Sequence, residues 1–319
     1  MTYNSYYSIE DFSVYVPSSK ADVPMVAEWI REKGFEFPHQ EVEKFLNEYR
    51  FNLVPVEEDK SLEEMIEQAC IPILDRQEIS GEKIDRIIFV KTSQVSWHEQ
   101  NLFRNLRNQY QCIKEASFVA LGQHNCATVH YALNLARNIF TVEEKTEQIL
   151  LVTADKAFHP VLRKIPDSLN GDSSSAILLS RSGKNHRIID VINFLDGSTF
   201  NGVNSDPKDI YWFNATYYFS LRQIILSILK KNQLSIENIK VIYGSNVNYS
   251  TWYKLSKMLD CNIEKFYTET IPSVGHLYCT DIIYNIKHSL NKDILKPGDL
   301  YLALTIGLGG SYGCSLHEY

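Results

Sequence analysis

ISGEKIDRIIFV (residues 79–90) and LSIENIKVIYGS (residues 234–245) are two stretches of this chain with the same order of residue types. Each has a Ser, then a Glu, then an Ile, and each ends in a run rich in β-branched and aromatic residues, which predicts a buried strand. About 150 residues separate the two stretches. A single repeat this long predicts two fused, pseudo-symmetric halves, because solenoids repeat every 20 to 50 residues or so.

The same offset relates other segments of the two halves. When the first half is shifted by this offset, the predicted helix that starts near Cys126 corresponds to the one that starts near His276. Two strand-like pairs are related in the same way: QILLVTAD (148–155) with DLYLALTIG (299–307), and GDSSSAILLS (171–180) with GGSYGCSLHEY (309–319). The turn-forming residues RSGKNH (181–186) lie between the halves. We therefore expect an N-terminal half over 1–182 and a C-terminal half over 183–319.

Strand-like and helix-like segments alternate through the first half. The predicted strands are short apolar runs of the buried type, over 86–93, 117–123, 148–155 and 176–180. Segments with the pattern of helices lie between them, over 101–110 and 127–140. This alternation predicts an α/β fold whose sheets are covered by helices.

Composition and charge exclude several classes of protein. The chain has 319 residues, of which 44% are hydrophobic and 22% charged, as is ordinary for a globular protein with a large core. Its net charge of −7 argues against a nucleic-acid or anionic-membrane surface. The N-terminal residues lack the pattern of a secretory signal, and no window approaches the roughly 18 apolar residues of a membrane span. We therefore expect a cytoplasmic protein.

Six cysteines are scattered along the chain without a CxxC pair, which argues against a zinc site or a disulfide framework. They are Cys70, Cys112, Cys126, Cys261, Cys279 and Cys314. Cys126 is the preferred nucleophile, because it opens a predicted helix whose free N–H groups and dipole stabilise a thiolate. The alternative is that Cys126 is an inert, buried small hydrophobe, as most buried cysteines are.

The order and spacing of three segments resemble the β-ketoacyl-acyl-carrier-protein synthase III family, whose members have the thiolase fold. HNCATVHYALNLA (124–136) resembles that family's nucleophile segment, in which a Cys opens a buried helix. GDSSSAILLS (171–180) resembles its Gly-Asp-Gly-Ala strand, and KPGDLYLALTIGLGGSYGCSL (296–316) resembles its C-terminal strand, Gly-rich turn and final strand. The resemblance covers nearly the whole chain. It implies an α/β, thiolase-like fold of two pseudo-symmetric halves in five layers, αβαβα.

Two segments depart from the condensing enzymes of that family. Those enzymes have a His in a His-Gln-Ala-Asn segment and an Asn in a His-Gly-Asn segment, and both polarise the malonyl thioester carbonyl while carbon dioxide leaves. In GSNVNYS (244–250), Ser245 stands at the His position and Asn248 at the closing Asn. In SVGHLYCTD (273–281), His276 stands at the position of the catalytic Asn. A hydroxyl replaces an imidazole poorly in decarboxylation, which argues against the usual condensation.

A divergent branch of the family resembles this pattern better. Its members transfer acyl groups to oxygen or to other acceptors, with a Cys, a His and an Asp five residues after the His. Cys126, His276 and Asp281 have that spacing. Because an ideal helix places residues five apart about 140° from each other, the triad requires His276 to precede the helix, on the turn that Gly275 begins. Alternatively, His276 is an ordinary buried polar residue and Asp281 only complements the helix dipole.

The resemblance implies ping-pong acyl transfer through a covalent acyl-enzyme. The Cys126 thiolate would attack an acyl thioester, and the backbone N–H groups of Cys126 and Gly309 would hold the oxyanion. His276 would then deprotonate the acceptor as a general base, with Asp281 orienting its imidazole. Cys279 is expected to be core packing.

The resemblance also implies an acyl donor on phosphopantetheine, attached to coenzyme A or to an acyl carrier protein, and no tightly bound cofactor or metal. Ser245 and Asn248 are candidates to contact the substrate. Because carrier proteins are acidic, exposed basic residues should surround the mouth of the tunnel, and Arg163, beside Lys164, is the candidate. The acceptor would be a small molecule or a carrier-bound group, and the resemblance implies a homodimer.

Three functions compete on this sequence. The first is an acyltransferase of specialised metabolism that moves an acyl group from a carrier or coenzyme A thioester to an alcohol, an amine or a carrier thiol. The second is a condensing enzyme that forms a C–C bond with an unusual Cys-His pair. The third is a non-catalytic subunit of an active homologue, against which the joint presence of Cys126, His276 and Asp281 argues.

Overall fold

The computed structural model of the chain describes residues 7–92, 98–197 and 206–319. Its main feature is a mixed sheet with the strand order β5-β4-β6-β9-β1-β10-β13-β12-β11. These strands are β1 (Tyr7–Tyr15), β4 (Arg86–Val90), β5 (Ser117–Leu121), β6 (Gln148–Asp155), β9 (Ser173–Ser180), β10 (Arg187–Leu195), β11 (Ile239–Gly244), β12 (Leu300–Gly307) and β13 (Ser311–Glu318). The strands predicted from sequence are present, and β6 coincides with the predicted 148–155. β4 and β5 end before the predicted 86–93 and 117–123 do, and residue 93 lies outside the described residues.

The strand order is symmetric about the junction of β1 and β10. Outward from that junction, β9, β6 and β4 follow on one side, and β13, β12 and β11 on the other. β4 is parallel to β6, and β11 is parallel to β12. β9 and β13 are each antiparallel to both of their neighbours. Among the described residues, β1 and β10 pair at Tyr7–Ile188 and Ser8–Arg187.

The symmetry fails at one edge of the sheet. β5 extends the sheet beyond β4 in the N-terminal half. In the described part of the C-terminal half, no strand extends it beyond β11, and Phe266 makes a single parallel bridge to Ile242 instead. The predicted division after residue 182 falls in the loop between β9 and β10 and stays a prediction.

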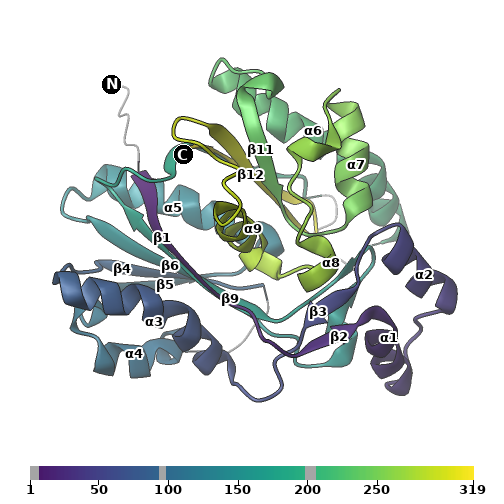
Figure 1. Cartoon of the computed structure of the whole chain (residues 1–319), viewed down its shortest axis with the longest axis horizontal. Helices are drawn as coiled ribbons and strands as arrows, with labels where there is room; N and C mark the ends of the chain where they lie inside the picture. Colours follow the sequence, from purple (N-terminus) through teal and green to yellow (C-terminus); the bar gives the residue numbers. More distant parts are fainter. Residues whose placement is uncertain (1–6, 93–97, 198–205) are drawn as a thin grey trace.

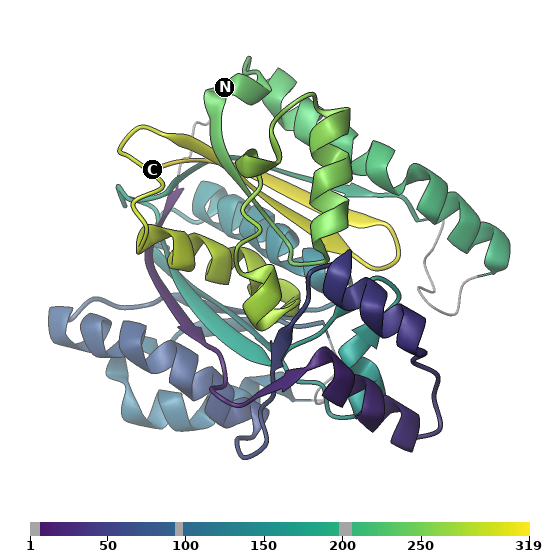
Figure 2. The ribbon, with the colours of Figure 1, turned by 45° about the vertical axis from the view of Figure 1, so that its right-hand side comes forward.

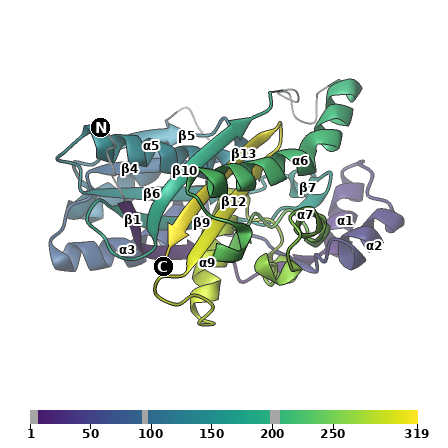
Figure 3. The same cartoon turned by 90° about the horizontal axis from the view of Figure 1, so that it is seen from above.

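Helices cover both faces of the sheet in each half. Helices and strands together form the five layers αβαβα (Figure 1). The helices are α1 (Val23–Glu32), α2 (His39–Asn47), α3 (Leu62–Ser80), α4 (Arg104–Gln109), α5 (Thr128–Val142), α6 (Pro207–Lys231), α7 (Tyr249–Met258), α8 (Ile271–Val274) and α9 (Asp281–Leu290). The outer helices α3 and α4 pack on the N-terminal strands, and α6 and α7 pack on the C-terminal strands. Figure 3 shows β10, β13 and β12 side by side beneath α6. None of the helices in the described ranges is long and apolar enough to cross a membrane.

The central layer consists of α5 and α9, and both contact strands of both halves. α5 packs against β4 and β6 but also against β10, β12 and β13, while α9 packs against β1 and β9 as well as β11 and β12. Their apolar side chains, among them Val129, Leu133, Ile282 and Ile283, share one buried core. The two helices that repeat in sequence therefore meet between the two halves of the sheet, and their first turns lie at the centre of the molecule.

An N-terminal excursion packs on the C-terminal half. β2 (Lys20–Asp22), α1, α2 and β3 (Leu53–Pro55) leave the first sheet and join the core that α6 and α7 form (Figure 2). This excursion brings Val54 of β3 beneath Gly275, which matters for the site below.

A buried polar network with three histidines lies under the central layer. His130 on α5 is 3.1 Å from the Ala303 carbonyl through Nε2 and 2.6 Å from the Thr305 hydroxyl through Nδ1. Burial lowers the pKa of His130 to about 3 and that of His186 to about 4, and it holds the pKa of His317 well below its usual value. All three are therefore neutral in the folded protein at pH 7.

We predict that His130→Gln reduces the acid sensitivity of the fold. A histidine whose pKa is lowered by folding gives stability that is present above its unfolded pKa of about 6.5 and is lost as the pH falls below it. The free energy of unfolding in urea, measured at pH 7 and pH 5, should fall by about 1–2 kcal/mol less in this variant than in wild type.

His39→Gln, at an exposed position of α2, is the control and should leave the difference between the two pH values unchanged. An identical pH dependence of wild type and His130→Gln would contradict the assignment of a buried neutral imidazole.

Candidate active site

Cys126 lies on a 3₁₀ turn, Asn125–Ala127, that leads directly into α5. Asn125 adopts φ 48°, and its side-chain amide donates to the Leu308 carbonyl in the Gly-rich turn between β12 and β13. The two segments are in close contact, because a Cβ on Gly307 would lie 2.1 Å from the His124 carbonyl oxygen. Cys126 therefore sits at the start of α5, as predicted, and its exposed fraction is 6%.

Two backbone hydrogen bonds fix the position of His276. Its N–H donates to the Leu169 carbonyl at 2.9 Å, and its carbonyl accepts from the Gly171 N–H at 2.9 Å. Gly275 precedes it at φ 59°, and a Cβ there would lie 2.5 Å from Val54 Cγ1. The turn therefore requires glycine, both for its left-handed conformation and for lack of room.

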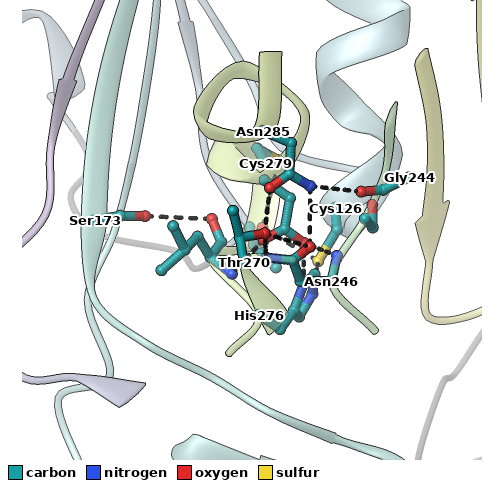
Figure 4. Close-up of polar contacts among 12 residues, drawn as sticks. Cys126, Ser173, Gly244, Asn246, Thr270, His276, Cys279 and Asn285 are labelled. Atoms are coloured by element: carbon teal, nitrogen blue, oxygen red, sulfur yellow. Dashed lines mark hydrogen bonds and ion pairs between the residues drawn. The ribbon is translucent and has the colours of Figure 1, made fainter. Parts of the chain in front are cut away.

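The structure brings the three predicted catalytic residues together, and Figure 4 shows two of them, Cys126 and His276, side by side. Cys126 Sγ is 3.1 Å from Nε2 of His276, and Nδ1 of His276 is hydrogen-bonded to Oδ2 of Asp281. The spacing of five residues is possible because a 3₁₀ turn, Tyr278–Thr280, separates the two, with Tyr278 at φ 53°. His276 thus precedes the helix and Asp281 begins it, which is the arrangement that the sequence required.

The Asp281 carboxylate is fully buried and accepts three hydrogen bonds. Besides His276, it accepts from the Leu277 N–H at Oδ1 (2.6 Å) and from the Asn246 N–H at Oδ2 (2.7 Å). Burial alone would lower the pKa of His276, but the charges and hydrogen bonds of Asp281 and Cys126 outweigh it and hold the pKa well above its usual value. The arrangement therefore favours an imidazolium beside the thiol sulfur.

Cys279 is close to Cys126 but lacks its environment. The Thr92 hydroxyl is 3.6 Å from Cys279 Sγ and donates to Cys126 Sγ at 3.9 Å. The Cys279 thiol points to the Asn125 carbonyl at 3.4 Å, and burial raises its pKa well above the usual value. A thiol that stays protonated and bonds a carbonyl suits core packing, as the sequence analysis expected.

The prediction of an exposed Arg163 at the tunnel mouth is wrong. Its side chain is buried and forms a two-pronged ion pair with Asp172, with N–O distances of 3.2 and 2.7 Å. Asp172 also accepts the backbone N–H groups of Glu57 and Ala157. The sequence around one Arg does not show whether its side chain will pair with a buried carboxylate. Here the ion pair holds in place the segment that hydrogen-bonds to the His276 backbone.

Ser245 and Asn248 are both buried. Asn248 caps α7 by accepting from the Thr251 N–H at 2.7 Å, and its amide nitrogen donates to the Asp167 carbonyl at 3.0 Å. Its side chain is thus occupied by structural contacts. The Ser245 hydroxyl, by contrast, makes no hydrogen bond with the residues that the structure describes. Gly309 adopts φ 99° in the Gly-rich turn, next to the Leu308 carbonyl that holds Asn125.

Three residues behind Asp281 are not predicted by any motif in the sequence. They are Asn246, Thr270 and Asn285, and all three are buried and hydrogen-bonded to one another. Only the place of Asn246 beside Ser245 could have drawn attention to it, since no motif contains Thr270 or Asn285. Within the described residues, no group of His, Cys, Asp and Glu side chains could hold a metal ion.

Part of the chain matches a known protein family. Residues 229–319 match a family described as 3-Oxoacyl-[acyl-carrier-protein (ACP)] synthase III C terminal. A comparison with curated proteins found no match.

Solved structures similar to the chain over nearly its whole length include synthases and an acyltransferase. The 3-oxoacyl-[acyl-carrier-protein] synthase III from Aquifex aeolicus VF5 has a TM-score of 0.80 at 18% identity, over 98% of this chain and 100% of that one. ChlB3, described as an acyltransferase, has a TM-score of 0.80 at 16% identity, over 98% and 97%. OleA from Xanthomonas campestris with cerulenin bound has a TM-score of 0.81 at 12% identity, over 99% of both chains. The predicted thiolase-like fold is therefore confirmed.

We predict that Asp281→Asn slows the alkylation of Cys126 by iodoacetamide. Asp281 opposes the lowering of the His276 pKa by burial. Without its carboxylate that pKa falls, so the imidazolium that favours the thiolate is lost at pH 7. The rate at pH 7, followed by mass spectrometry of the Cys126 peptide, should fall on the order of tenfold.

Asp75→Asn is the matched control, because Asp75 is a remote carboxylate that accepts a hydrogen bond from Tyr110. Its rate should equal that of wild type. An undiminished rate in Asp281→Asn would mean that the Asp281 carboxylate does not set the reactivity of Cys126.

Proposed function

We propose that the chain is an acyltransferase of the thiolase-fold synthase III family that works through a Cys126–His276–Asp281 triad. The observation that carries this proposal is the 3.1 Å contact of Cys126 Sγ with a His276 ring whose other nitrogen bonds Asp281. Nucleophile, base and orienting carboxylate in this order are the arrangement used for acyl transfer on several unrelated folds.

In the first half-reaction the Cys126 thiolate attacks the carbonyl carbon of an acyl thioester. A C–S bond to Cys126 forms, the bond to the donor sulfur breaks, and the departing thiolate takes the proton from the His276 imidazolium. The backbone N–H groups of Cys126 and Gly309 hold the oxyanion. The contact between the turn of Cys126 and the Gly-rich turn, through Asn125 and Leu308, supports this role.

In the second half-reaction His276 accepts the proton of the acceptor's hydroxyl, amine or thiol. Two of the contributions that raise the pKa of His276 come from Cys126, through its charge and its hydrogen bond. Acylation removes the charge, so the imidazole of the acyl-enzyme holds its proton less tightly. The acceptor attacks the acyl carbon and Cys126 leaves as a thiolate, which restores the ion pair. The same residue thus serves as acid and then as base.

Transfer is favoured over decarboxylative condensation by what surrounds the sulfur. Where condensing enzymes carry a His, this chain has Ser245. A serine side chain lacks the ionisable ring that polarises the malonyl carbonyl. The His276 imidazole, which contacts Cys126, is bonded to Asp281, and this pairing suits proton transfer. Ser245 is buried with a free hydroxyl among the described residues, which supports its proposed contact with the acyl group or the acceptor.

The donor is proposed to be an acyl group on the phosphopantetheine of coenzyme A or of an acyl carrier protein, and the protein a cytoplasmic homodimer in specialised biosynthesis. The C-terminal family match and the similarity to synthase III and acyltransferase structures support the proposed donor. The two halves proposed from sequence, 1–182 and 183–319, would then supply the nucleophile and the His–Asp pair respectively.

We predict that incubation with a panel of acyl-coenzyme A and acyl-carrier thioesters adds one acyl group to Cys126. Intact-protein mass spectrometry would show the added mass, and peptide mapping would place it. Cys126→Ala should lose the adduct completely, because the sulfur is the only atom that forms the bond. Cys261→Ser, which removes a distant and partly exposed thiol, is the matched control and should acylate as wild type does.

Two outcomes would contradict the proposal. One is the absence of any adduct with every thioester, which would remove the acyl-enzyme. The other is release of carbon dioxide from radiolabelled malonyl-carrier protein in a reaction that depends on Cys126, which would establish the condensing alternative.

A further inference from the structure

We propose that Asn246 is a positioning residue for the Cys126–His276–Asp281 triad, because its side chain fixes its own backbone N–H on the Asp281 carboxylate. This inference rests on the proposed function, in which Asp281 orients His276. Figure 4 shows Asn246, Thr270 and Asn285 gathered beside His276. They come from the loop after β11, from the segment before α8 and from α9, so the side chains tie together three separate parts of the chain.

The three side chains form a closed ring of hydrogen bonds. Asn246 Nδ2 donates to the Thr270 hydroxyl at 3.1 Å, the Thr270 hydroxyl donates to Asn285 Oδ1 at 2.5 Å, and Asn285 Nδ2 donates to Asn246 Oδ1 at 2.9 Å. Asn285 Nδ2 also donates to the Gly244 carbonyl at 3.0 Å. All three residues are at most 1% exposed. In a dry environment such a ring is mutually reinforcing, and breaking one member leaves the others unsatisfied.

The ring adds side-chain contacts to the backbone hydrogen bonds that position the loop around Asn246. Val247 N–H donates to the Ser245 carbonyl at 2.7 Å, which closes a three-residue turn with Asn246 at its centre. Such a turn lacks the ladder of hydrogen bonds that fixes a strand or helix. Asn285 lies one helical turn after Asp281 on α9, and the two therefore share a face. Asn246 thus contacts α9 twice, through its side chain at Asn285 and through its N–H at Asp281.

The consequence reaches Cys126 through Asp281 and His276. The ionisable groups that act on His276 are Asp281 on α9 and Cys126 before α5. If the Asn246 N–H moves, the Asp281 carboxylate loses a donor and can rotate away from Nδ1 of His276. The imidazolium is then less well supported, and the thiolate beside it forms less readily. The expected signature is a loss of Cys126 reactivity on the acid side of its pH profile.

The experiment compares Thr270→Val, which breaks the ring, with Thr270→Ser, which keeps its hydroxyl. The rate of Cys126 alkylation by iodoacetamide is measured from pH 5.5 to pH 9 together with the melting temperature of the full chain. At pH 6 we expect Thr270→Val to react at least fivefold more slowly than wild type, and Thr270→Ser to react within twofold of it. Asn246→Ala keeps the backbone N–H but removes the side chain that holds it on the Asp281 carboxylate. This variant should behave as Thr270→Val does.

Ser289→Ala is the control for a merely structural loss. Ser289 is buried on the same helix and its hydroxyl bonds Tyr243 on β11, but it does not touch Asp281. This variant should melt at a lower temperature with the wild-type pH profile. The proposal is overturned if Thr270→Val and Asn246→Ala also keep the wild-type pH profile. If Thr270→Val does not fold, the profile of Asn246→Ala decides the question by itself. Failure of wild type to accept any acyl thioester would remove the proposed function, while the alkylation profiles would still decide this inference.

Discussion

The contact between Cys126 and His276 is the constraint on which the rest of the structure depends. The two residues are 150 positions apart, and a distance of 3.1 Å between their reactive atoms leaves little freedom to the elements that hold them. Each stands on a 3₁₀ turn or loop just before a central helix, and those helices are packed between sheets of both halves. The pseudo-symmetric strand order therefore has a direct consequence for chemistry, because it directs the first turns of α5 and α9 toward each other.

Close approach of backbones sets the remaining geometry. Gly275 turns where Val54 leaves no room for a Cβ, and Gly307 lies against the carbonyl of His124. The buried Arg163–Asp172 ion pair holds the segment that bonds both sides of the His276 backbone. A buried ion pair of this kind adds little net stability but strongly disfavours any arrangement that separates its partners. Its use here is to fix a position rather than to strengthen the fold.

The electrostatics of the site are those of a proton-transfer pair. Burial disfavours a charged His276, and Asp281 together with Cys126 reverses that preference. The consequence is a coupling between the covalent state of the sulfur and the basicity of the ring, which is what the proposed two-step transfer requires. Asp281 can serve this purpose because three donors hold its carboxylate, one of them on a loop that side-chain contacts help to position.

The sequence by itself determined the alternation of strands and helices and the repeat, because the hydrophobic period is a local property. The residues of the triad were predicted from the resemblance to a known family. The sequence also indicated that His276 must precede its helix, as helical geometry alone demands. Tertiary structure decided what spacing cannot encode: that Arg163 pairs with Asp172 inside the protein, that Asn248 caps a helix, and that Asn246, Thr270 and Asn285 meet behind Asp281. These contacts join residues from separate elements, and whether a polar side chain meets water or a buried partner depends on how the layers pack.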